Sequence, residues 1–466
     1  MENKENNRLL MAFYGDDFTG STDALEFLCK AGVKTVLFID VPTKEQLLNY
    51  ADLQAIGVAG VSRALSPVKM EAELLPTFEA LKELKPQHVH YKVCSTFDSS
   101  PTIGSIGKAI DVGQSVFKGT YVPLLVAAPA LGRYCLFGNL FARMGIGSDG
   151  DIYRLDRHPS MSKHPVTPAD ESDLRLHLGK QTNKKIGLFN ITALHHYAEK
   201  HFDVDFGDHE IVLFDALKAE DLIPIGEIIA QSSKQDHIVF SVGSSGIEMA
   251  LGSYWKEKGI VKDKLGWRNI KCSKPILVIS GSCSPVTSSQ IKYALDNGFA
   301  EIAIDTVAFA NRYSSDSDID ENLISIYVEQ VVKFISDGKN VLIHTSLGND
   351  DLRVVESDKI FSNNELNKST ASIVYGRVLG EIAKKVAEKT NLERLVIAGG
   401  DTSSYAARAM GIEAMEMISP LTAGAPLCKV HSTNSDINNL HVVFKGGQVG
   451  KQDFFVQASK DIINIK

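Results

Sequence analysis

The stretch MAFYGDDFTGSTDALEFL, residues 11–28, sets the pattern that most of the chain repeats. Its first five residues form an apolar run that predicts a buried strand, and a helix-like run over 23–32 follows closely. Between the two lies a turn with adjacent carboxylates, Asp16 and Asp17, and several hydroxyl side chains. Two carboxylates this close raise each other's pKa unless cations, hydroxyl groups or a helix N-terminus compensate. The turn is therefore a candidate ligand site.

The alternation of strand and helix continues beyond this stretch. Apolar runs typical of buried strands recur at residues 33–39, 53–60, 88–94 and 121–129. Helix-like runs separate them, at 69–84 and 103–117. From about residue 275 a second series of strand, turn and helix begins. We therefore predict an α/β protein with two domains, each a mostly parallel sheet flanked by helices.

The length and the polar segments indicate how the chain is divided. At 466 residues it is long for a single core, which favours two domains. The polar segment 256–274 is the predicted linker, so the domains are expected over 1–255 and 275–466. The irregular segment 145–175 is long for a plain connection, and we expect it to be a functional loop or a lid.

Composition and charge restrict the class of protein. With 44% hydrophobic and 23% charged residues, the chain is typical of a soluble globular protein. A formal net charge of −8 argues against nucleic acid or an anionic membrane as the main partner. No signal-peptide core or membrane-spanning run is found, and the six cysteines form no C-x-x-C pair. We expect a cytoplasmic protein that binds a small molecule, with a homo-oligomer left open.

Two turns in the second half have the composition of phosphate-binding loops. Their residues are Gly399, Gly400, Asp401, Thr402 and Ser403 in one turn, and Gly281, Ser282 and Ser284 in the other. Glycines allow close approach of the backbone, and free N–H groups at a helix N-terminus favour a phosphate, so two such turns suggest a nucleotide. Simple helix capping is the alternative. No predicted strand is followed by G-x-G-x-x-G, and no complete P-loop is present, which disfavours a dinucleotide oxidoreductase and a Walker-type ATPase.

In the first half, charged and hydroxyl side chains follow three of the predicted strands. They are Asp16, Asp17, Arg63, Lys92, Ser95, Thr96 and Asp98. Because the carboxyl ends of parallel strands meet at one edge of a sheet, we expect one pocket. Carboxylates bind hydroxyls, and cations bind a carboxylate or phosphate, so the pocket suits a small polyhydroxylated acid. An ion-pair network in which Arg63 and Lys92 only neutralise the aspartates is the alternative.

Taken together, five motifs resemble the four-carbon acid sugar kinase family. They are YGDDFTGSTDALE, KVCSTFDSS, SGSCSPVTSSQI, AGGDTSSYAARAMGI and FKGGQVGKQDFF, and in this order they cover nearly the whole chain. The resemblance implies a two-domain kinase that depends on ATP, and phosphoryl transfer from ATP is expected to use Mg²⁺. It also implies transfer to the terminal hydroxyl of an acid such as threonate, erythronate, a 3-oxo-tetronate or the branched 3-oxo-isoapionate.

The resemblance also implies roles for particular residues. It places the acid in the first domain, on Asp16, Asp17, Arg63 and the stretch from Lys92 to Asp98. It places ATP in the second domain, on Ser282 or Ser284, on Gly399 to Thr402 and on Gly447. Two departures are that Asp401 stands where some members have Glu, and that KGGQVG replaces the more common KSGNFG.

Phosphoryl transfer requires positioning, charge neutralisation and an acceptor for the hydroxyl proton. We expect Asp17 to orient or deprotonate the attacking hydroxyl and Asp16 to bind a neighbouring one. Arg63 and Lys92 are expected to hold the substrate carboxylate, and Asp401 is the alternative base.

Two other classes remain as alternatives to a kinase. A non-catalytic sensor of a sugar acid and a nucleotide would lack the acidic residues, which are present here. An oxidoreductase on a similar fold would need a dinucleotide fingerprint, which is missing. The sequence identifies neither the acid nor the hydroxyl that is phosphorylated, and it indicates no metal ligands.

Overall fold

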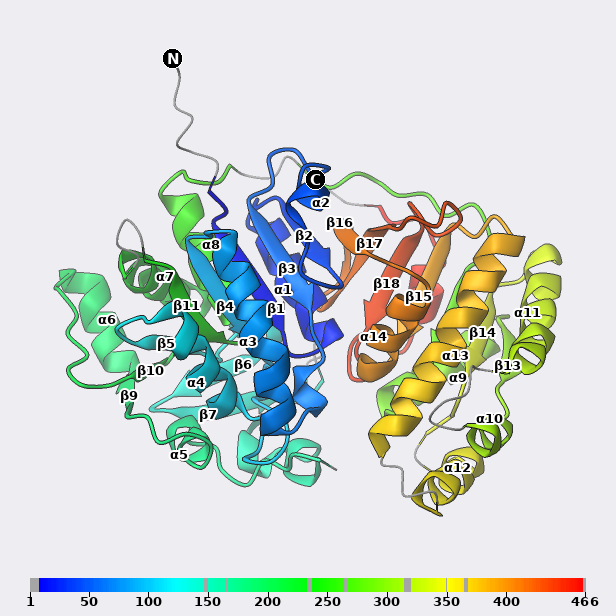
Figure 1. The fold of residues 1–466 in the computed structure, drawn as a ribbon, viewed down its shortest axis with the longest axis horizontal. Coiled ribbons are helices and arrows are strands. Elements are labelled where there is room, and N and C mark those ends of the chain that lie inside the picture. Colours follow the sequence, from blue (N-terminus) through cyan, green and yellow to red (C-terminus); the bar gives the residue numbers. More distant parts are fainter. Residues whose placement is uncertain are drawn as a thin grey trace. The chain divides into compact units, whose positions relative to one another are not determined.

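The computed structural model describes residues 8–145, 150–164, 166–232, 237–262, 266–313, 320–348, 350–363 and 368–463. The side chains of Lys368, Ser369 and Asp401 are outside this description. The chain divides into two compact units, Met1–Leu265 and Gly266–Lys466, and each is described by itself. Each unit has a sheet flanked by helices, so the predicted two-domain α/β class is confirmed (Figure 1).

The first unit is built on a parallel sheet with the strand order β2-β3-β1-β4-β11-β5-β10-β9 (Figure 1, blue to green). Its strands are β1 (Met11–Gly15), β2 (Thr35–Phe38), β3 (Ala55–Ala59), β4 (His88–Lys92), β5 (Val122–Leu125), β9 (Ile186–Phe189), β10 (Ile211–Phe214) and β11 (Val239–Gly243). The central strands are buried on both faces, which explains why their sequences are continuous apolar runs.

Helices cover both faces of this sheet. They are α1 (Phe18–Lys30), α2 (Lys44–Leu47), α3 (Pro67–Glu83), α4 (Ile106–Phe117), α5 (Leu174–Gly179), α6 (Ile191–Lys200), α7 (Leu222–Gln231) and α8 (Gly246–Glu257). Helix α3 packs on α4, while α8 packs on both α1 and α7. Right-handed crossovers place these two groups on opposite faces, because the chain moves in opposite directions along the sheet after β1 and after β3.

The register of the central strands positions the first site. Gly15, the last residue of β1, lies beside Ala59 at the end of β3 and beside Lys92 at the end of β4. The residues that follow these three strands therefore share one edge of the sheet. This is the carboxyl edge, where open α/β sheets bind their ligands.

A small antiparallel sheet after β5 was not anticipated from the sequence. It contains β6 (Arg133–Leu136), β7 (Asn139–Arg143) and β8 (Ile152–Arg154). The short helical turns Leu155–Arg157 and Met161–Lys163 follow β8. The segment 145–175, expected as an irregular loop, therefore includes regular elements within its described part.

The second unit has a mixed sheet with the strand order β13-β14-β12-β15-β18-β17-β16. Its strands are β12 (Leu277–Ser280), β13 (Ala300–Ala303), β14 (Val341–His344), β15 (Arg394–Ala398), β16 (Ala414–Thr422), β17 (Ala425–His431) and β18 (His441–Lys445). Five strands are parallel, whereas β17 runs antiparallel to both β16 and β18. The sequence did not predict this antiparallel part.

The helices of the second unit are α9 (Pro285–Asp296), α10 (Thr306–Arg312), α11 (Glu321–Ser336), α12 (Leu352–Asn363), α13 (Lys368–Lys389), α14 (Gly400–Ala409) and α15 (Phe454–Ala458). The register aligns Ser280, Ala398 and Lys445, which end β12, β15 and β18. The three turns that follow these strands therefore lie side by side. Among the described helices of both units, none is long and apolar enough to cross a membrane.

An aromatic cluster anchors α3 on the first sheet. Phe78 is fully buried, and its ring lies 5.4 Å from that of Phe240 and 6.2 Å from that of Tyr91, centre to centre. We predict that Phe78→Ala lowers the free energy of unfolding by about 3–5 kcal/mol, because it leaves a cavity in a packed core. Val68→Ala, at an exposed position of the same helix, is the control and should change it by less than about 0.5 kcal/mol. Urea unfolding measures both, and equal effects would contradict this packing.

Candidate functional site

The acidic turn after β1 holds its two carboxylates in different ways. Asp17 is the N-cap of α1, and its Oδ1 accepts a hydrogen bond of 2.7 Å from the Gly20 N–H. Its Oδ2 accepts from the Thr19 hydroxyl at 2.8 Å and pairs with the Arg63 guanidinium, also at 2.8 Å. Burial opposes the charge, but Arg63 and these hydrogen bonds outweigh it and hold the pKa of Asp17 below its ordinary value. Asp17 is therefore an ionised carboxylate whose oxygens are already engaged.

Asp16 is held mainly through its backbone. Its N–H donates to the Lys92 carbonyl at 2.8 Å, and its carbonyl accepts from the Arg63 N–H at 3.0 Å. The side chain is buried, and its Oδ1 has no hydrogen-bond partner among the described residues. Burial, together with the negative charge of Asp17, raises the pKa of Asp16 to about 7. The adjacent carboxylates thus have opposite pKa shifts, and Asp16 has an oxygen left to bind a ligand.

A second group of buried charges lies around Lys92. Its Nζ is 3.8 Å from Asp23 Oδ2 and donates to the Val93 carbonyl at 2.9 Å. Burial disfavours the ammonium, but Asp23, Glu248 and Asp16 together raise the pKa of Lys92 above its ordinary value. The carboxylates thus keep Lys92 charged inside the protein.

Glu248 on α8 belongs to the same group. Both of its carboxylate oxygens are buried without a hydrogen bond to any described residue, and Oε1 lies 3.6 Å from His90 Nε2. Burial raises the pKa of Glu248 to about 8. Asp23, His90 and Glu248 were not predicted from the sequence as site residues. The one available signal was the spacing of His88, His90 and Lys92, which places three ionisable side chains on one face of a buried strand.

The loop after β4 carries the remaining predicted residues, Ser95, Thr96 and Asp98. The Thr96 hydroxyl lies 2.9 Å from Cys94 Sγ, and Ser95 is buried. Asp98 Oδ1 is buried and makes no hydrogen bond within the described part of the chain. The structure thus brings all seven residues predicted in the first half to the carboxyl edge of one sheet.

The segment after β8 packs against this loop. The Ser99 hydroxyl lies 3.0 Å from His177 Nε2 and accepts from the Gln181 amide at 2.9 Å. A small cavity separates Thr96 to Ser99 from this segment, and the side chains that close it are Leu155, Thr167, Ala169, Leu174 and His177. The segment expected as a functional loop therefore forms a wall beside Asp98.

In the second unit, glycines bring the three turns at the carboxyl edge into close contact. A methyl group at Gly281 would lie 2.2 Å from Thr402 Oγ1, and one at Gly447 would lie 3.1 Å from Ser282 Oγ. Gly399 has a φ of 125°, a conformation that favours glycine. The turns after β12, β15 and β18 thus form one cradle of backbone and hydroxyl groups.

The helices that leave the cradle begin at its turns. Ser284 is the N-cap of α9, and Gly400 is the first residue of α14. The Ser403 hydroxyl donates to the Gly399 carbonyl at 2.7 Å, so it serves the backbone of the turn. Free N–H groups at two helix N-termini suit a phosphate group. The side chain of Asp401, predicted here as a site residue, is outside the described part of the structure.

Lys445, which the sequence analysis did not single out, lies under this cradle. It ends β18, is fully buried, and donates to Thr287 Oγ1 and to the Gly446 carbonyl, both at 2.9 Å. Thr287 in turn donates to the Gly447 carbonyl at 3.1 Å. Burial lowers the pKa of Lys445 to about 7. Lys445 and Thr287 thus fix the glycine turn from below.

A hollow of about 960 Å³ adjoins the cradle. Cys283, Pro285 and Ser288 line it on the side of the turn after β12. Its other walls come from the ends of β13 and β14 and the start of α12, where Arg353 donates to Asp351 at 2.6 Å. The hollow is therefore at the ligand-binding edge of the second sheet.

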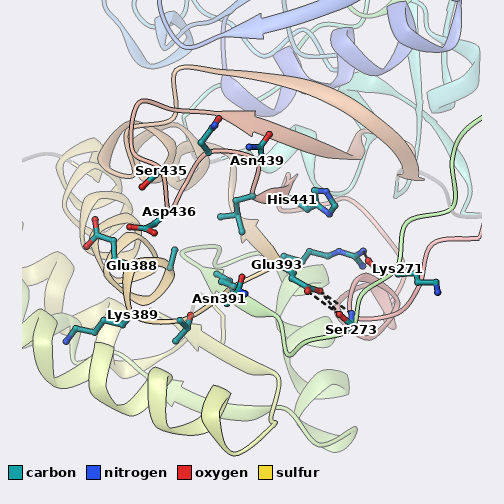
Figure 2. Close-up of a pocket in the computed structure, with 16 residues that line it drawn as sticks. Lys271, Ser273, Glu388, Lys389, Asn391, Glu393, Ser435, Asp436, Asn439 and His441 are labelled. Atoms are coloured by element: carbon teal, nitrogen blue, oxygen red, sulfur yellow. Dashed lines mark hydrogen bonds between the residues drawn. The ribbon is translucent and has the colours of Figure 1, made fainter.

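A polar pocket of about 700 Å³ lies at the opposite edge of this sheet, where β15 and β18 begin (Figure 2). Figure 2 shows Glu388, Asp436, Lys271 and His441 around it, and Ser273 donates to Glu393 at 3.1 Å. Amino ends of parallel strands are not where such sheets bind ligands. We therefore do not include this pocket in the candidate functional site.

Comparisons with known proteins assign a different kind of ligand-binding domain to each of the two units. A family model described as a sugar-binding N-terminal domain matches residues 11–251, and one described as a nucleotide-binding C-terminal domain matches residues 277–455. Both sheets thus belong to known ligand-binding domains. The chain belongs to the four-carbon acid sugar kinase family, as the sequence motifs predicted.

Two curated relatives and two solved structures extend the comparison. The chain is 39% identical to the 3-oxo-isoapionate kinase of Paraburkholderia graminis, over 96% of this chain and 93% of that protein. It is 27% identical to the 3-oxo-tetronate kinase of Pseudomonas savastanoi pv. phaseolicola, over 98% of each. Structures from Salmonella typhimurium LT2 (TM-score 0.71, 23% identity) and of Haemophilus influenzae protein HI1011 (0.65, 22%) have the same fold, each covering 96% of this chain and 98% of the solved chain.

The raised pKa of Glu248 predicts how stability depends on pH. The folded protein holds the proton of the Glu248 carboxyl group up to about pH 8, whereas the unfolded chain releases it near pH 4.5. The stability that this protonation gives the folded state is therefore lost as pH rises through 8. We predict that Glu248→Gln melts several degrees above the wild type at pH 9 and close to it at pH 5. Glu199→Gln, at an exposed position on α6, is the control and should show no such difference. A Glu248→Gln variant less stable than wild type at pH 9 would contradict the burial argument.

Proposed function

We propose that this chain is an ATP-dependent kinase that phosphorylates the terminal hydroxyl of a small sugar acid. The observation that carries the proposal is Asp16, a buried carboxylate with an unpartnered oxygen and a pKa of about 7 at the carboxyl edge of the sugar-binding domain. The glycine cradle in the nucleotide-binding domain supplies the second site that a kinase needs, the one for the phosphate donor. Either domain by itself would support ligand binding but not phosphoryl transfer.

The acid is proposed from the relatives and from the pocket. Branched 3-oxo-isoapionate is the first candidate, because the relative of that name is 39% identical to this chain. The four-carbon acids threonate, erythronate and the 3-oxo-tetronates come next. Three buried carboxylate oxygens that lack partners among the described residues, Asp16 Oδ1, Asp23 Oδ1 and Asp98 Oδ1, are suited to accept hydrogen bonds from substrate hydroxyls.

The base is proposed to be Asp16, although the sequence favoured Asp17. A general base works best when its pKa lies near the working pH and its oxygen can reach the proton. Asp16 meets the first condition and has an oxygen available, whereas both oxygens of Asp17 are engaged by Gly20, Thr19 and Arg63. Asp17 is then the residue that caps α1 and fixes the turn. Asp401, whose side chain is not described, stays the sequence-based alternative.

The nucleotide is proposed to bind the cradle in the second unit. Ser282, Ser284, Gly447 and the turn from Gly399 to Ser403 would surround its phosphates, with the adjoining hollow left for the rest of the nucleotide. Within the described residues, no three His, Cys, Asp or Glu side chains form a metal site. Mg²⁺ is proposed to arrive bound to ATP, because Mg²⁺ keeps several waters and takes phosphate oxygens as ligands, and there it would neutralise phosphate charge.

A coupled assay of ADP release tests the proposal. Wild-type protein with Mg-ATP is given 3-oxo-isoapionate, the 3-oxo-tetronates, D- and L-threonate and D-erythronate in turn. We expect turnover with one acid at least ten times that of the others, and none without acid. ATP binding without turnover of any acid would favour a sensor, and nicotinamide binding instead of ATP would favour an oxidoreductase.

The two aspartates give a prediction about pH dependence. If Asp16 is the base, kcat of the wild type falls as pH drops below about 7, where Asp16 takes up its proton. Asp16→Asn should lower kcat about 10²- to 10⁴-fold with little change in KM. Asp17→Asn should mainly raise KM and lower the melting temperature, because it weakens a helix cap and leaves Arg63 without that partner. A normal kcat in Asp16→Asn, with a loss in Asp17→Asn or Asp401→Asn, would move the role of base to that residue.

The cradle gives a prediction about nucleotide affinity. Gly447→Val places a branched side chain against the turn at Ser282 and Ser284, where even a methyl group is 3.1 Å from its neighbours. We expect the Kd for ATP to rise at least tenfold, while the affinity for the acid stays the same. The control is Gly266→Val, because nothing lies within 4 Å of a methyl group there. Calorimetric titration measures both ligands, and unchanged ATP affinity in Gly447→Val would remove the cradle from the nucleotide site.

A further inference from the structure

We propose that Arg133 of β6 binds the carboxylate of the sugar acid and so selects acids over neutral polyols. The inference rests on the proposed function and deepens it, since it names the group that recognises the acid. It also gives a role in ligand binding to the small antiparallel sheet after β5.

Arg133 is buried, with 5% of its surface exposed. Its guanidinium donates hydrogen bonds to the described residues through Nη1 alone. Nη1 donates to the carbonyls of Leu131 at 3.1 Å, Gly132 at 3.3 Å and Arg143 at 3.1 Å. Nε is buried without a partner, and Nη2 makes no hydrogen bond to the described residues. No described carboxylate lies within 4 Å of this guanidinium. Arg133 is thus a buried cation without a counterion in contact.

Such a cation is costly unless something pairs with it. Buried charges in proteins are normally paired, because burial removes their hydration. The edge formed by Nε and Nη2 is the one that can take both oxygens of a carboxylate in parallel hydrogen bonds. An anionic group of the ligand would therefore supply the partner that the folded chain lacks.

The charged groups that act on Arg133 belong to the proposed sugar-acid pocket. Burial lowers the pKa of Arg133, and the groups that act against this include Cys94 and Asp98 on the loop after β4 and Asp23 on α1. Arg133 also lies just after β5, where its backbone pairs with Ala128 through hydrogen bonds of 3.0 and 3.2 Å. The guanidinium therefore lies within electrostatic range of Asp23 and Asp98, two of the three carboxylates proposed to bind the substrate hydroxyls.

The two cations that the sequence assigned to the carboxylate are already paired. Arg63 contacts Asp17 at 2.8 Å, and Lys92 is held by Asp23 at 3.8 Å. Their charges offset carboxylates of the protein, which was the alternative that the sequence left open. An acid entering this pocket meets several aspartates, so it needs a positive charge that these do not already neutralise.

A second buried arginine shows what a purely structural guanidinium looks like here. Arg394 in the second unit donates from Nη1 to the carbonyls of Ala458 and Lys460, and from Nη2 to that of Lys271. Both of its terminal nitrogens therefore serve the backbone. Nε is buried without a described partner in both arginines, so the difference lies in Nη2, which serves the backbone in Arg394 and makes no hydrogen bond to the described residues in Arg133.

The test compares each acid with its neutral analogue. Wild type, Arg133→Gln and Arg133→Lys are assayed at saturating Mg-ATP with the acid selected by the ADP-release assay, with its amide and with the matching polyol. In Arg133→Gln we expect kcat/KM for the acid to fall about 10- to 100-fold, the range for hydrogen bonds to a charged group, and that for the neutral analogues to fall less than threefold. Arg133→Lys should recover part of the loss, and the KM for ATP should not change. The control Arg394→Lys should leave the ratio of acid to polyol unchanged.

Three outcomes would overturn the assignment. They are an equal loss for acid and polyol in Arg133→Gln, an unchanged KM for the acid, and a wild type that does not distinguish the acid from its amide. The last comparison needs no variant, so it holds even if Arg133→Gln fails to fold. If no acid is turned over at all, the kinase proposal fails, and Arg133 is then tested by melting temperature. An acid-dependent rise in the wild type that is absent in Arg133→Gln and partly kept in Arg133→Lys would still support carboxylate binding, and equal rises in wild type and Arg133→Gln would contradict it.

Discussion

The first unit depends on two adjacent carboxylates that are buried where a central strand ends. Burying both is unfavourable unless their charges are offset, and the fold does this differently for each. Asp17 is ionised because Arg63, Thr19 and Gly20 all bind it, while Asp16 keeps a raised pKa and an oxygen without a partner. One residue of the pair thus builds the turn, and the other is left available for chemistry.

The second unit meets a different constraint, which is the close approach of three turns. The register aligns the ends of β12, β15 and β18, and glycines at 281, 399 and 447 leave no room for side chains between the turns. Lys445 and Thr287 hold the last turn in place from the core side. In both units, the carboxyl edge of a mostly parallel sheet therefore collects the residues that we propose to bind a ligand.

Much of this arrangement could be predicted from the sequence, because it depends on local patterns. Apolar runs, helix caps and glycine turns indicated the parallel strands, and the carboxyl-edge rule grouped Asp16, Arg63 and Lys92. The antiparallel strands β6 to β8 and β16 to β18 were missed although neighbouring segments form them: two residues join β6 to β7, and two join β16 to β17. The alternation of strand and helix hid these short hairpins. Arg133, Glu248 and Lys445 were missed for a different reason: their roles depend on burial and on the contacts they make or lack, which no spacing in the sequence reveals.

Transfer of a phosphoryl group from ATP to a hydroxyl of a sugar acid can be followed by phosphorus-31 NMR of wild-type protein with Mg-ATP and the best acid of the panel. We expect a new phosphomonoester signal, split by the two protons of a terminal CH₂ group, that grows in step with ADP. Release of ADP with inorganic phosphate alone, or a phosphorus signal on a carboxylate oxygen, would contradict it.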